Sequence, residues 1–344
     1  MTRTTRLVPA LVAGALALGL AVGPSTPASA TSAQAGNWLE KQLTNGLVHN
    51  DTFDVDDYGL TADTAMALVE LGGHRHAVAQ TRRALAKHVD SWTTGVDFGS
   101  RDIFAGSVAK ALVFAQLTGA KPRDFGGVNL VKRLNGRISS ERGIVGRLQD
   151  KTTGDDFANT LGQAYAAAGL TRARSGEARA TVRFLLKQQC DAGYFRLRFA
   201  DATAADQTCD GAARKDRAPD TDATAIAVIN LQSIRRPSQP VKRSIASALA
   251  WLVRHQGRSG SFGGGPTTKA PNTNSTGLAA LALAQGGRCR AADNATDWIA
   301  PLQKRNGAIA YNRAAFRAGI DRQSLDQWRR ATSQAAPSLN LPGC

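Results

Sequence analysis

One short phrase recurs along this sequence and constrains its fold more than any other feature. It reads aromatic, aliphatic, three residues, Gln, three residues, Gly, one residue, apolar. Full copies occupy residues 184–195, 251–262 and 298–309, and a copy one residue shorter occupies 38–48. A phrase that returns with the same internal spacing indicates one supersecondary unit stacked on itself, so we expect a repeat architecture.

Each position of the phrase has a structural reason. The aromatic and aliphatic residues precede the Gln by about one helical turn, which is typical of an amphipathic helix. The Gly four residues after the Gln predicts a left-handed residue that ends this helix. The Gln amide can hydrogen-bond to backbone groups of a neighbouring helix, and the last apolar residue can fold back onto the core. The phrase therefore predicts a scaffold and carries no chemistry of its own.

A second helix with a small-residue face follows the phrases and their eroded equivalents. These second helices are expected to begin at Asp63, Ser107, Asn159, Asp222 and Ser275. All five are residue types that cap helix N-termini. Because small side chains let helices pack closely around an axis, we expect this second set to line the inside of the fold.

The two kinds of helix alternate six times, which predicts an all-α fold in which six antiparallel helix pairs close into an α6/α6 toroid. The pairs are expected to start near Gly36, Val78, Val128, Arg179, Pro240 and Ala291. The sixth inner helix, near residues 324–333, is more polar than the others, as a terminal repeat can be. No linker interrupts the series, so residues 36–344 are expected to form one domain with a polar surface loop at 203–220.

The first thirty residues have the features of a cleaved signal peptide. Arg3 and Arg6 precede an uncharged run at residues 7–22, and Ala28-Ser29-Ala30 is a small-residue cleavage site. No later stretch is apolar for long enough to cross a bilayer. We therefore expect cleavage near Ala30 and a secreted protein that does not span the membrane.

The mature chain is expected to be strongly basic. Removing Arg3 and Arg6 lowers the formal net charge from +16 to +14. Such a cation can adsorb to an anionic cell-wall polymer. However, the basic residues are dispersed among the repeats rather than gathered with interleaved aromatic residues, which argues against specific nucleic-acid binding.

The four cysteines, Cys190, Cys209, Cys289 and Cys344, all lie in the second half of the chain. An even number in an exported chain indicates disulfides, and four cysteines allow three pairings. Cys190 lies inside a repeat phrase and Cys209 in the loop after it, while the terminal Cys344 can reach Cys289 between the last two repeats. These positions favour the pairs 190–209 and 289–344, and the spacings match no zinc site.

The phrase resembles the QW motif of the squalene and terpene cyclases, whose toroid is shared by protein prenyltransferase β-subunits. The three full copies match it, with Phe or Ile in place of the final Trp. The resemblance covers nearly the whole of residues 36–344. It implies an α/α toroid more strongly than it implies an activity.

The resemblance also implies where catalysis would take place. Class II cyclases protonate their substrate with the middle aspartate of an Asp-x-Asp-Asp-Thr-Ala signature. Residues 54–57 read Asp-Val-Asp-Asp, but the Thr-Ala follows later, at Thr64-Ala65. Alignment on that dipeptide puts Ala62 at the proton-donor position, and a methyl group has no proton to deliver. The remaining catalytic candidates are Asp56, Asp57 and Asp63, and the zinc ligands of prenyltransferases are unmatched, so no metal or cofactor is expected.

The inner helices of a toroid run parallel, so their N-termini meet at one mouth. Their amides favour an anion or a polar carbonyl ligand. The candidate ligand-binding residues are Asp57, Tyr58, Asp63, Ser107, Asn159, Asp222, Asn274 and Ser275. Further residues expected around this mouth are Asp102, Phe104, Asp156, Phe157 and Asp220. The competing interpretation is that each of them is only a helix cap or a solvated neighbour.

The leading functional hypothesis is a secreted, non-catalytic module that binds a small molecule or peptide at this mouth. One alternative is an extracellular enzyme of the terpene cyclase or prenyltransferase type that uses the aspartates of the mouth. A third is a sugar-processing α6/α6 barrel, which the Gln-x3-Gly phrases and the scarcity of glutamate disfavour.

Overall fold

The computed structural model describes residues 31–341 and 344. The expected signal peptide lies outside these residues. The described part of the chain contains fourteen α-helices, three short 3₁₀ helices and one two-stranded antiparallel ribbon, β1 (His49–Asn50) with β2 (Val55–Asp56). The expected all-α class is therefore confirmed.

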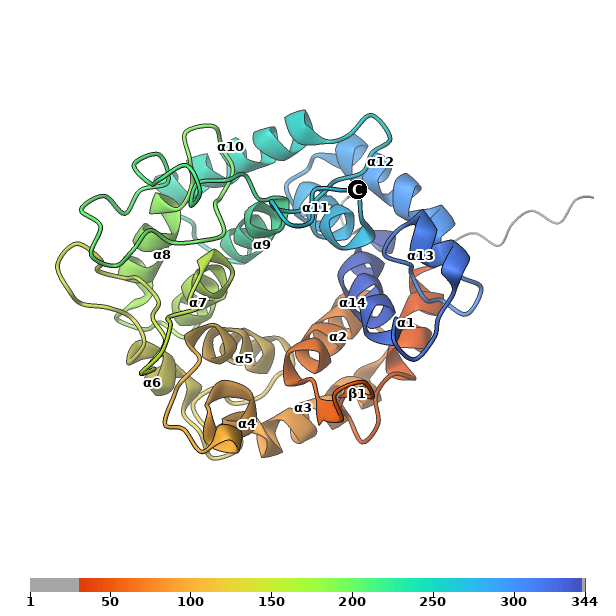
Figure 1. Ribbon diagram of the computed structural model, residues 1–344, viewed down its shortest axis with the longest axis horizontal. Coiled ribbons are helices and arrows are strands. Elements are labelled where there is room, and N and C mark those ends of the chain that lie inside the picture. Colours follow the sequence, from red (N-terminus) through yellow and green to blue (C-terminus); the bar gives the residue numbers. More distant parts are fainter. Residues whose placement is uncertain (1–30, 342–343) are drawn as a thin grey trace, which may run out of the picture.

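Six helices form a closed inner ring (Figure 1). They are α2 (Tyr58–Leu71), α5 (Ala105–Leu117), α7 (Thr160–Arg172), α9 (Thr221–Gln232), α11 (Thr273–Gln285) and α14 (Leu325–Ala335). Each packs against the next, and α14 packs back against α2. This closure is the toroid that the repeated phrase predicts.

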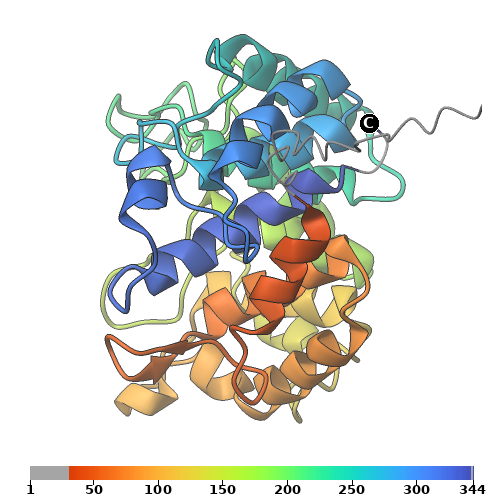
Figure 2. The ribbon, with the colours of Figure 1, turned by 90° about the vertical axis from the view of Figure 1, so that its right-hand side faces the viewer.

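The remaining helices lie outside this ring (Figures 1 and 2). They are α1 (Ser32–Glu40), α3 (Arg75–Lys87), α4 (Val89–Thr93), α6 (Leu130–Asn135), α8 (Ala178–Lys187), α10 (Gln239–His255), α12 (Cys289–Ile299) and α13 (Arg313–Ala318), with the 3₁₀ helices η1 (Val96–Phe98) and η2 (Ala300–Leu302). The 3₁₀ helix η3 (Ala336–Leu339) directly follows α14 and packs against the inner helices α2 and α11. The outer helix of each repeat begins within four residues of its expected start. The predicted sixth inner helix corresponds to α14.

The Gln of each full phrase ties one repeat to the next. Its side-chain amide donates to the Gly carbonyl four residues on, and also to a carbonyl of the following outer helix. Gln189 reaches Ser244 O at 3.0 Å and Gln256 reaches Ala291 O at 2.8 Å. Gln303 donates to Thr31 O at 3.0 Å and accepts from Thr31 N at 2.8 Å, which joins the last repeat to the first. The amides thus satisfy backbone groups that helix ends leave free.

The glycine of the phrase is needed for two reasons at Gly260 and Gly307. Both have a positive φ, 91° and 98°, which side chains with a Cβ rarely adopt. Both also lie against the backbone of the next outer helix: a Cβ at either position would lie 2.0 Å from a carbonyl oxygen, of Asn294 and Gln34 respectively. Glycine therefore allows neighbouring repeats to approach each other closely.

A buried threonine fixes each of four inner helices at the same height. Thr61, Thr224, Thr276 and Thr332 are fully buried, and their hydroxyl oxygens accept from the backbone N–H of Val48, Phe195, Phe262 and Ile309. These acceptor contacts are 2.8–2.9 Å long. Since the four donors are the final apolar residues of the phrases, the threonines are equivalent positions and give a common register for the inner ring.

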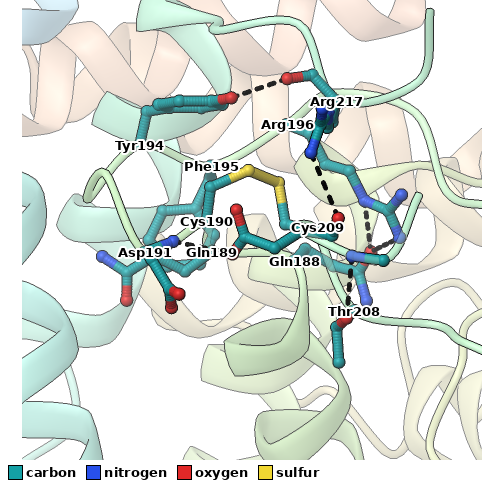
Figure 3. Close-up of a disulfide and its surroundings, with 12 residues drawn as sticks. Gln188, Gln189, Cys190, Asp191, Tyr194, Phe195, Arg196, Thr208, Cys209 and Arg217 are labelled. Carbon is teal, nitrogen blue, oxygen red and sulfur yellow. Dashed lines mark hydrogen bonds between the residues drawn. A yellow bond between two sulfur atoms is a disulfide. The ribbon is translucent and has the colours of Figure 1, made fainter. Parts of the chain in front are cut away.

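The disulfides are Cys190–Cys209 and Cys289–Cys344, the pairing that the sequence favours. Figure 3 shows the first beside the buried guanidinium of Arg196, whose Nε and Nη2 donate to Gln188 Oε1 at 2.9 and 2.7 Å. Arg196 Nη2 also donates to Gln207 O at 3.0 Å. The segment 203–220 is thus not wholly a surface loop, because Gln207, Cys209 and Asp220 are buried.

None of the helices in residues 31–341 is both long enough and apolar enough to cross a membrane.

Candidate functional site

The six inner helices enclose a cavity of about 780 Å³. The side chains that line it come from every inner helix. On α7 they extend from Asn159, just before the helix, to Arg172 at its end, thirteen residue steps or about 20 Å of helix rise. The cavity therefore follows the toroid axis over most of the length of the inner helices.

An apolar belt surrounds the middle of this cavity. On α2, α9 and α11 the belt residue lies five positions after the buried threonine of that helix, and Pro337 in η3 lies five positions after Thr332 of α14. On α5 and α7 it lies three positions after Lys110 and Tyr165. The six belt residues are Met66, Val113, Ala168, Ile229, Leu281 and Pro337. All six of these residues are apolar, and none of them is aromatic.

The layer above the belt, toward the N-terminal ends of the inner helices, is polar on one side. Lys110 Nζ lies 2.6 Å from Asp63 Oδ1 and also donates to Gly59 O at 3.1 Å. Burial is the main reason that the pKa of Tyr165 is raised, and the charge of the nearby Asp63 carboxylate adds to the rise. Gln334 completes the polar side, while Ile226 and Leu278 occupy the other side.

Tyr165 has the chemistry of a ligand-binding group. Its raised pKa keeps the phenol protonated at ordinary pH, so the hydroxyl can both donate and accept. No described residue forms a hydrogen bond with that hydroxyl, although it lines the cavity. A free hydroxyl beside an ion pair is a natural contact for the polar end of a ligand.

A second polar cluster lies one helical turn above Ile226, on the same face of α9. It comprises Asp222, Asn274 and Ser275, and one side-chain oxygen of each is buried without a hydrogen-bond partner. Burial raises the pKa of Asp222 to about 6, and the charge of Asp220 adds to this rise. Ser275 opposes the rise, although no hydrogen bond of normal geometry joins its hydroxyl to the carboxyl.

The expectation that Asp63, Ser107, Asp222 and Ser275 are N-caps is wrong. The caps of α2, α9 and α11 are Asp57, Asp220 and Asn272, whose side chains accept from Leu60 N, Ala223 N and Ser275 N, and Phe104 precedes α5 without a side-chain cap. Each helix begins two to six residues earlier than expected. A preceding side chain caps α2, α9 and α11, whereas the first amide of α5, Ala105 N, donates to Asp150 Oδ1 at 2.6 Å. Only Asn159 caps as predicted, accepting from Leu161 N and Gly162 N.

The structure brings only part of the predicted ring to the cavity. Asp63, Ser107 and Asn159 line it. Asp57 is occupied by its capping bond and by an ion pair with Arg330, and Tyr58 stacks on His88 at a centroid distance of 5.6 Å. Asp222, Asn274 and Ser275 lie above the cavity lining, in the buried cluster described above. Phe157 is 77% exposed, on the loop before α7.

The catalytic candidates from the first helix pair are engaged in structural contacts. Asp56 lies on β2, where its Oδ1 is 3.1 Å from His49 Nδ1, and this hydrogen bond is the main reason that the pKa of His49 is raised. Ala62 is fully buried in the core beside α5, so the position aligned with the cyclase proton donor holds a methyl group that faces away from the cavity. Among the described residues, no group of three or more His, Cys, Asp or Glu could hold a metal ion.

Sequence reasoning missed two side chains of this site, Tyr165 and Lys110. Composition alone does not mark them, because which face of an inner helix meets the cavity depends on closure of the ring. Asp222 is one of the expected ligand-binding residues, but its place in a cyclase-like signature was not among the expectations: residues 220–225 read Asp-Thr-Asp-Ala-Thr-Ala, which keeps the middle aspartate and lacks only the third. This signature is therefore the sequence signal that marks Asp222.

No known family model matches the sequence, and no curated protein matches it. Solved structures do match its fold. A protein from Actinoplanes is 15% identical with a TM-score of 0.63, over 90% of this chain and 98% of the other. The type II terpene cyclase MstE from Scytonema is 16% identical with a TM-score of 0.62, over 90% and 95%. An unsaturated glucuronyl hydrolase from Bacillus sp. GL1 is 10% identical with a TM-score of 0.58, over 88% and 94%.

These likenesses confirm the fold that the repeated phrase implies. At 10–16% identity they show the architecture alone. The chain has the α/α toroid of a type II terpene cyclase and of a glycan-degrading hydrolase, and one fold can carry unrelated functions.

Proposed function

We propose that this protein binds an elongated amphipathic small molecule within the toroid, with the apolar part of the molecule in the belt and a polar end beside Asp63, Lys110 and Tyr165. The observation that carries the proposal is the complete apolar belt between polar layers in a cavity of about 780 Å³. Cavities of this size bury most of a small ligand, and a few placed polar groups fix its orientation.

A binding role is favoured over cyclase chemistry by what surrounds the belt. Cations are stabilised by aromatic faces, and the aromatic residues among the described cavity lining are Trp92 and Tyr165 alone. Asp63, the candidate acid in the cavity, is engaged by Lys110, whose Nζ lies 2.6 Å from Asp63 Oδ1.

A chain-length series tests the proposal. Linear primary alcohols of six to sixteen carbons would be titrated by calorimetry into the mature protein. We expect the affinity to rise with each added methylene, by up to about 0.8 kcal/mol, until the chain fills the cavity, and then to level off. Weak binding with no dependence on chain length would contradict an apolar cavity site.

Acid catalysis at Asp222 is a second candidate, favoured by its match to the cyclase signature and by its pKa of about 6. A buried protonated carboxyl is the group that general-acid chemistry requires. The MstE structures include a complex with geranylgeranyl dihydroxybenzoate, described as its substrate. Incubation with squalene and with geranylgeranyl compounds, followed by mass spectrometry, tests this candidate: a cyclised product that Asp222→Asn abolishes and Asp63→Asn retains would support it.

We further propose that the protein works outside the cytoplasm and that its basic surface holds it near anionic polymers. Two disulfides support an oxidising compartment. Retention of the purified protein on isolated cell walls, lost at high salt, would support the surface role.

A further inference from the structure

At the C-terminal ends of the inner helices the cavity meets a second polar layer, named here the lower ring. Its residues are Glu70, Gln116, Arg172, Gln232, Ser233 and Gln285, one or more from each of five inner helices. Glu70 and Gln285 lie nine positions after Thr61 and Thr276, so they belong to one level. Glu70, Arg172 and Gln285 are exposed, so the cavity reaches the surface at this end.

The amides of the lower ring leave acceptor oxygens free. Gln116 Nε2 donates to Gly169 O at 2.9 Å and Gln232 Nε2 to Ala282 O at 3.4 Å, each on the next inner helix. These contacts use the amide nitrogens and fix the side chains. Gln232 Oε1 is buried without a hydrogen-bond partner. A buried acceptor left unpaired costs free energy, which a ligand that donates a hydrogen bond would recover.

Three side chains of the lower ring have no partner among the described residues. No described residue forms an ion pair or hydrogen bond with the side chains of Glu70, Arg172 or Gln285. Burial raises the pKa of the Glu70 carboxyl, although part of that residue is exposed. With one acid and one base, the formal charge of the ring is zero, so it does not select for an ionic group.

We propose that the lower ring is a binding subsite for an uncharged, hydroxyl-rich head group such as a sugar, carried by the same molecule whose apolar part fills the belt. This rests on the proposed function. A hydroxyl donates to the glutamine oxygens and to Glu70 and accepts from Arg172, so it satisfies every kind of group in the ring. An ether oxygen accepts only and leaves the glutamine oxygens unpaired.

Two detergents with the same eight-carbon chain separate these cases. Octyl glucoside offers several hydroxyl donors, whereas tetraethylene glycol octyl ether offers ether acceptors and a single terminal hydroxyl. Both would be titrated by calorimetry, below their micellar concentrations, into the full mature protein. We expect the glucoside to bind at least about tenfold more tightly, a difference of about 1.4 kcal/mol.

The variant Gln285→Leu removes one ring amide that holds no other residue in place. We expect a five- to tenfold loss of affinity for the glucoside and none for the ether. Gln239→Leu, on the exposed outer surface of α10, is the matched control and should bind both as the wild type does. Circular dichroism checks folding, and Gln285→Met gives a second variant of similar size.

The outcomes distinguish the two proposals. Equal affinity for both detergents, or an unchanged preference in both Gln285 variants, overturns the lower ring as a head-group site and leaves the cavity proposal standing. Failure of both detergents to bind overturns the cavity proposal and the lower ring with it.

Discussion

The environment of the Asp222 carboxyl differs strongly from that of a carboxyl in water. Its pKa rises from 3.8 to about 6, mainly because it is buried. The folded state therefore holds this proton to a higher pH than the unfolded state does. As the pH rises from about 4 to about 6, ionisation of Asp222 favours unfolding, and the stability contributed at low pH is lost.

We predict that Asp222→Asn, which stays neutral, gains stability over the wild type as the pH rises through that range. The difference is expected to be small at pH 4 and up to about 3 kcal/mol at pH 7.5. Urea unfolding at both pH values measures it. Asp293→Asn, exposed on α12, is the control and should show no such gain. An equal effect of Asp222→Asn at both pH values would contradict the raised pKa.

The ion pair of Lys110 with Asp63 is the other unusual contact in the site. Both side chains are largely buried, so removal of one partner leaves a charge beside the apolar belt. We predict that Lys110→Met lowers stability by about 2 kcal/mol and that adding Asp63→Asn restores most of the loss. A double-mutant cycle of unfolding free energies measures this coupling, and strictly additive losses would count against it.

Helices and their connections are held by the repeated glutamines. Gln303 differs from the others because it exchanges two hydrogen bonds with Thr31 and so joins the end of the ring to its beginning. Replacing it should loosen α1 in particular, because Thr31, which Gln303 binds, is the N-cap of that helix.

We therefore predict that Gln303→Leu lowers stability by about 1–2 kcal/mol and speeds amide hydrogen exchange in α1 more than elsewhere. Hydrogen exchange read by mass spectrometry resolves the two ends of the chain. Gln256→Leu is the matched control and should affect α12 instead, since its amide reaches Ala291. Uniform loosening by both variants would show that these bonds act on the whole fold rather than on one junction.

The helices could be predicted from sequence because the phrase specifies contacts between neighbouring repeats. Its Gln, Gly and final apolar residue each have one position in the packed unit, so the outer helices begin where expected. The starts of the inner helices could not be predicted as well. Their caps, such as Asp57 and Asp220, lie in loops of different length, where several aspartates and asparagines can fill the role.

The candidate site was harder to predict than the fold. Which face of an inner helix meets the cavity depends on closure of the ring, and small residues occur on every face. In retrospect, polar and apolar residues spaced three or four apart do mark it, as in Asp63, Met66 and Glu70. That pattern becomes visible only when the six helices are aligned on the register threonines.

The closed toroid explains how such a chain can hold a cavity along its axis. Each inner helix is supported on both sides by its neighbours and from behind by an outer helix, so the cavity walls do not depend on a ligand for their position. The disulfide of Cys289 with Cys344 fixes the end of the chain beside the C-terminal end of α11, next to the lower ring. The two polar layers and the belt between them are therefore held at fixed heights.

The central claim is that this cavity binds ligands, and blocking it is the most direct test. The apolar probe N-phenyl-1-naphthylamine would be titrated by fluorescence into the wild type, into Ile229→Trp in the belt, and into Val253→Trp on the exposed face of α10. We predict saturable binding to the wild type and to Val253→Trp, with at least a tenfold loss in Ile229→Trp. Equal binding by all three folded proteins would place the probe elsewhere and contradict the cavity as the site.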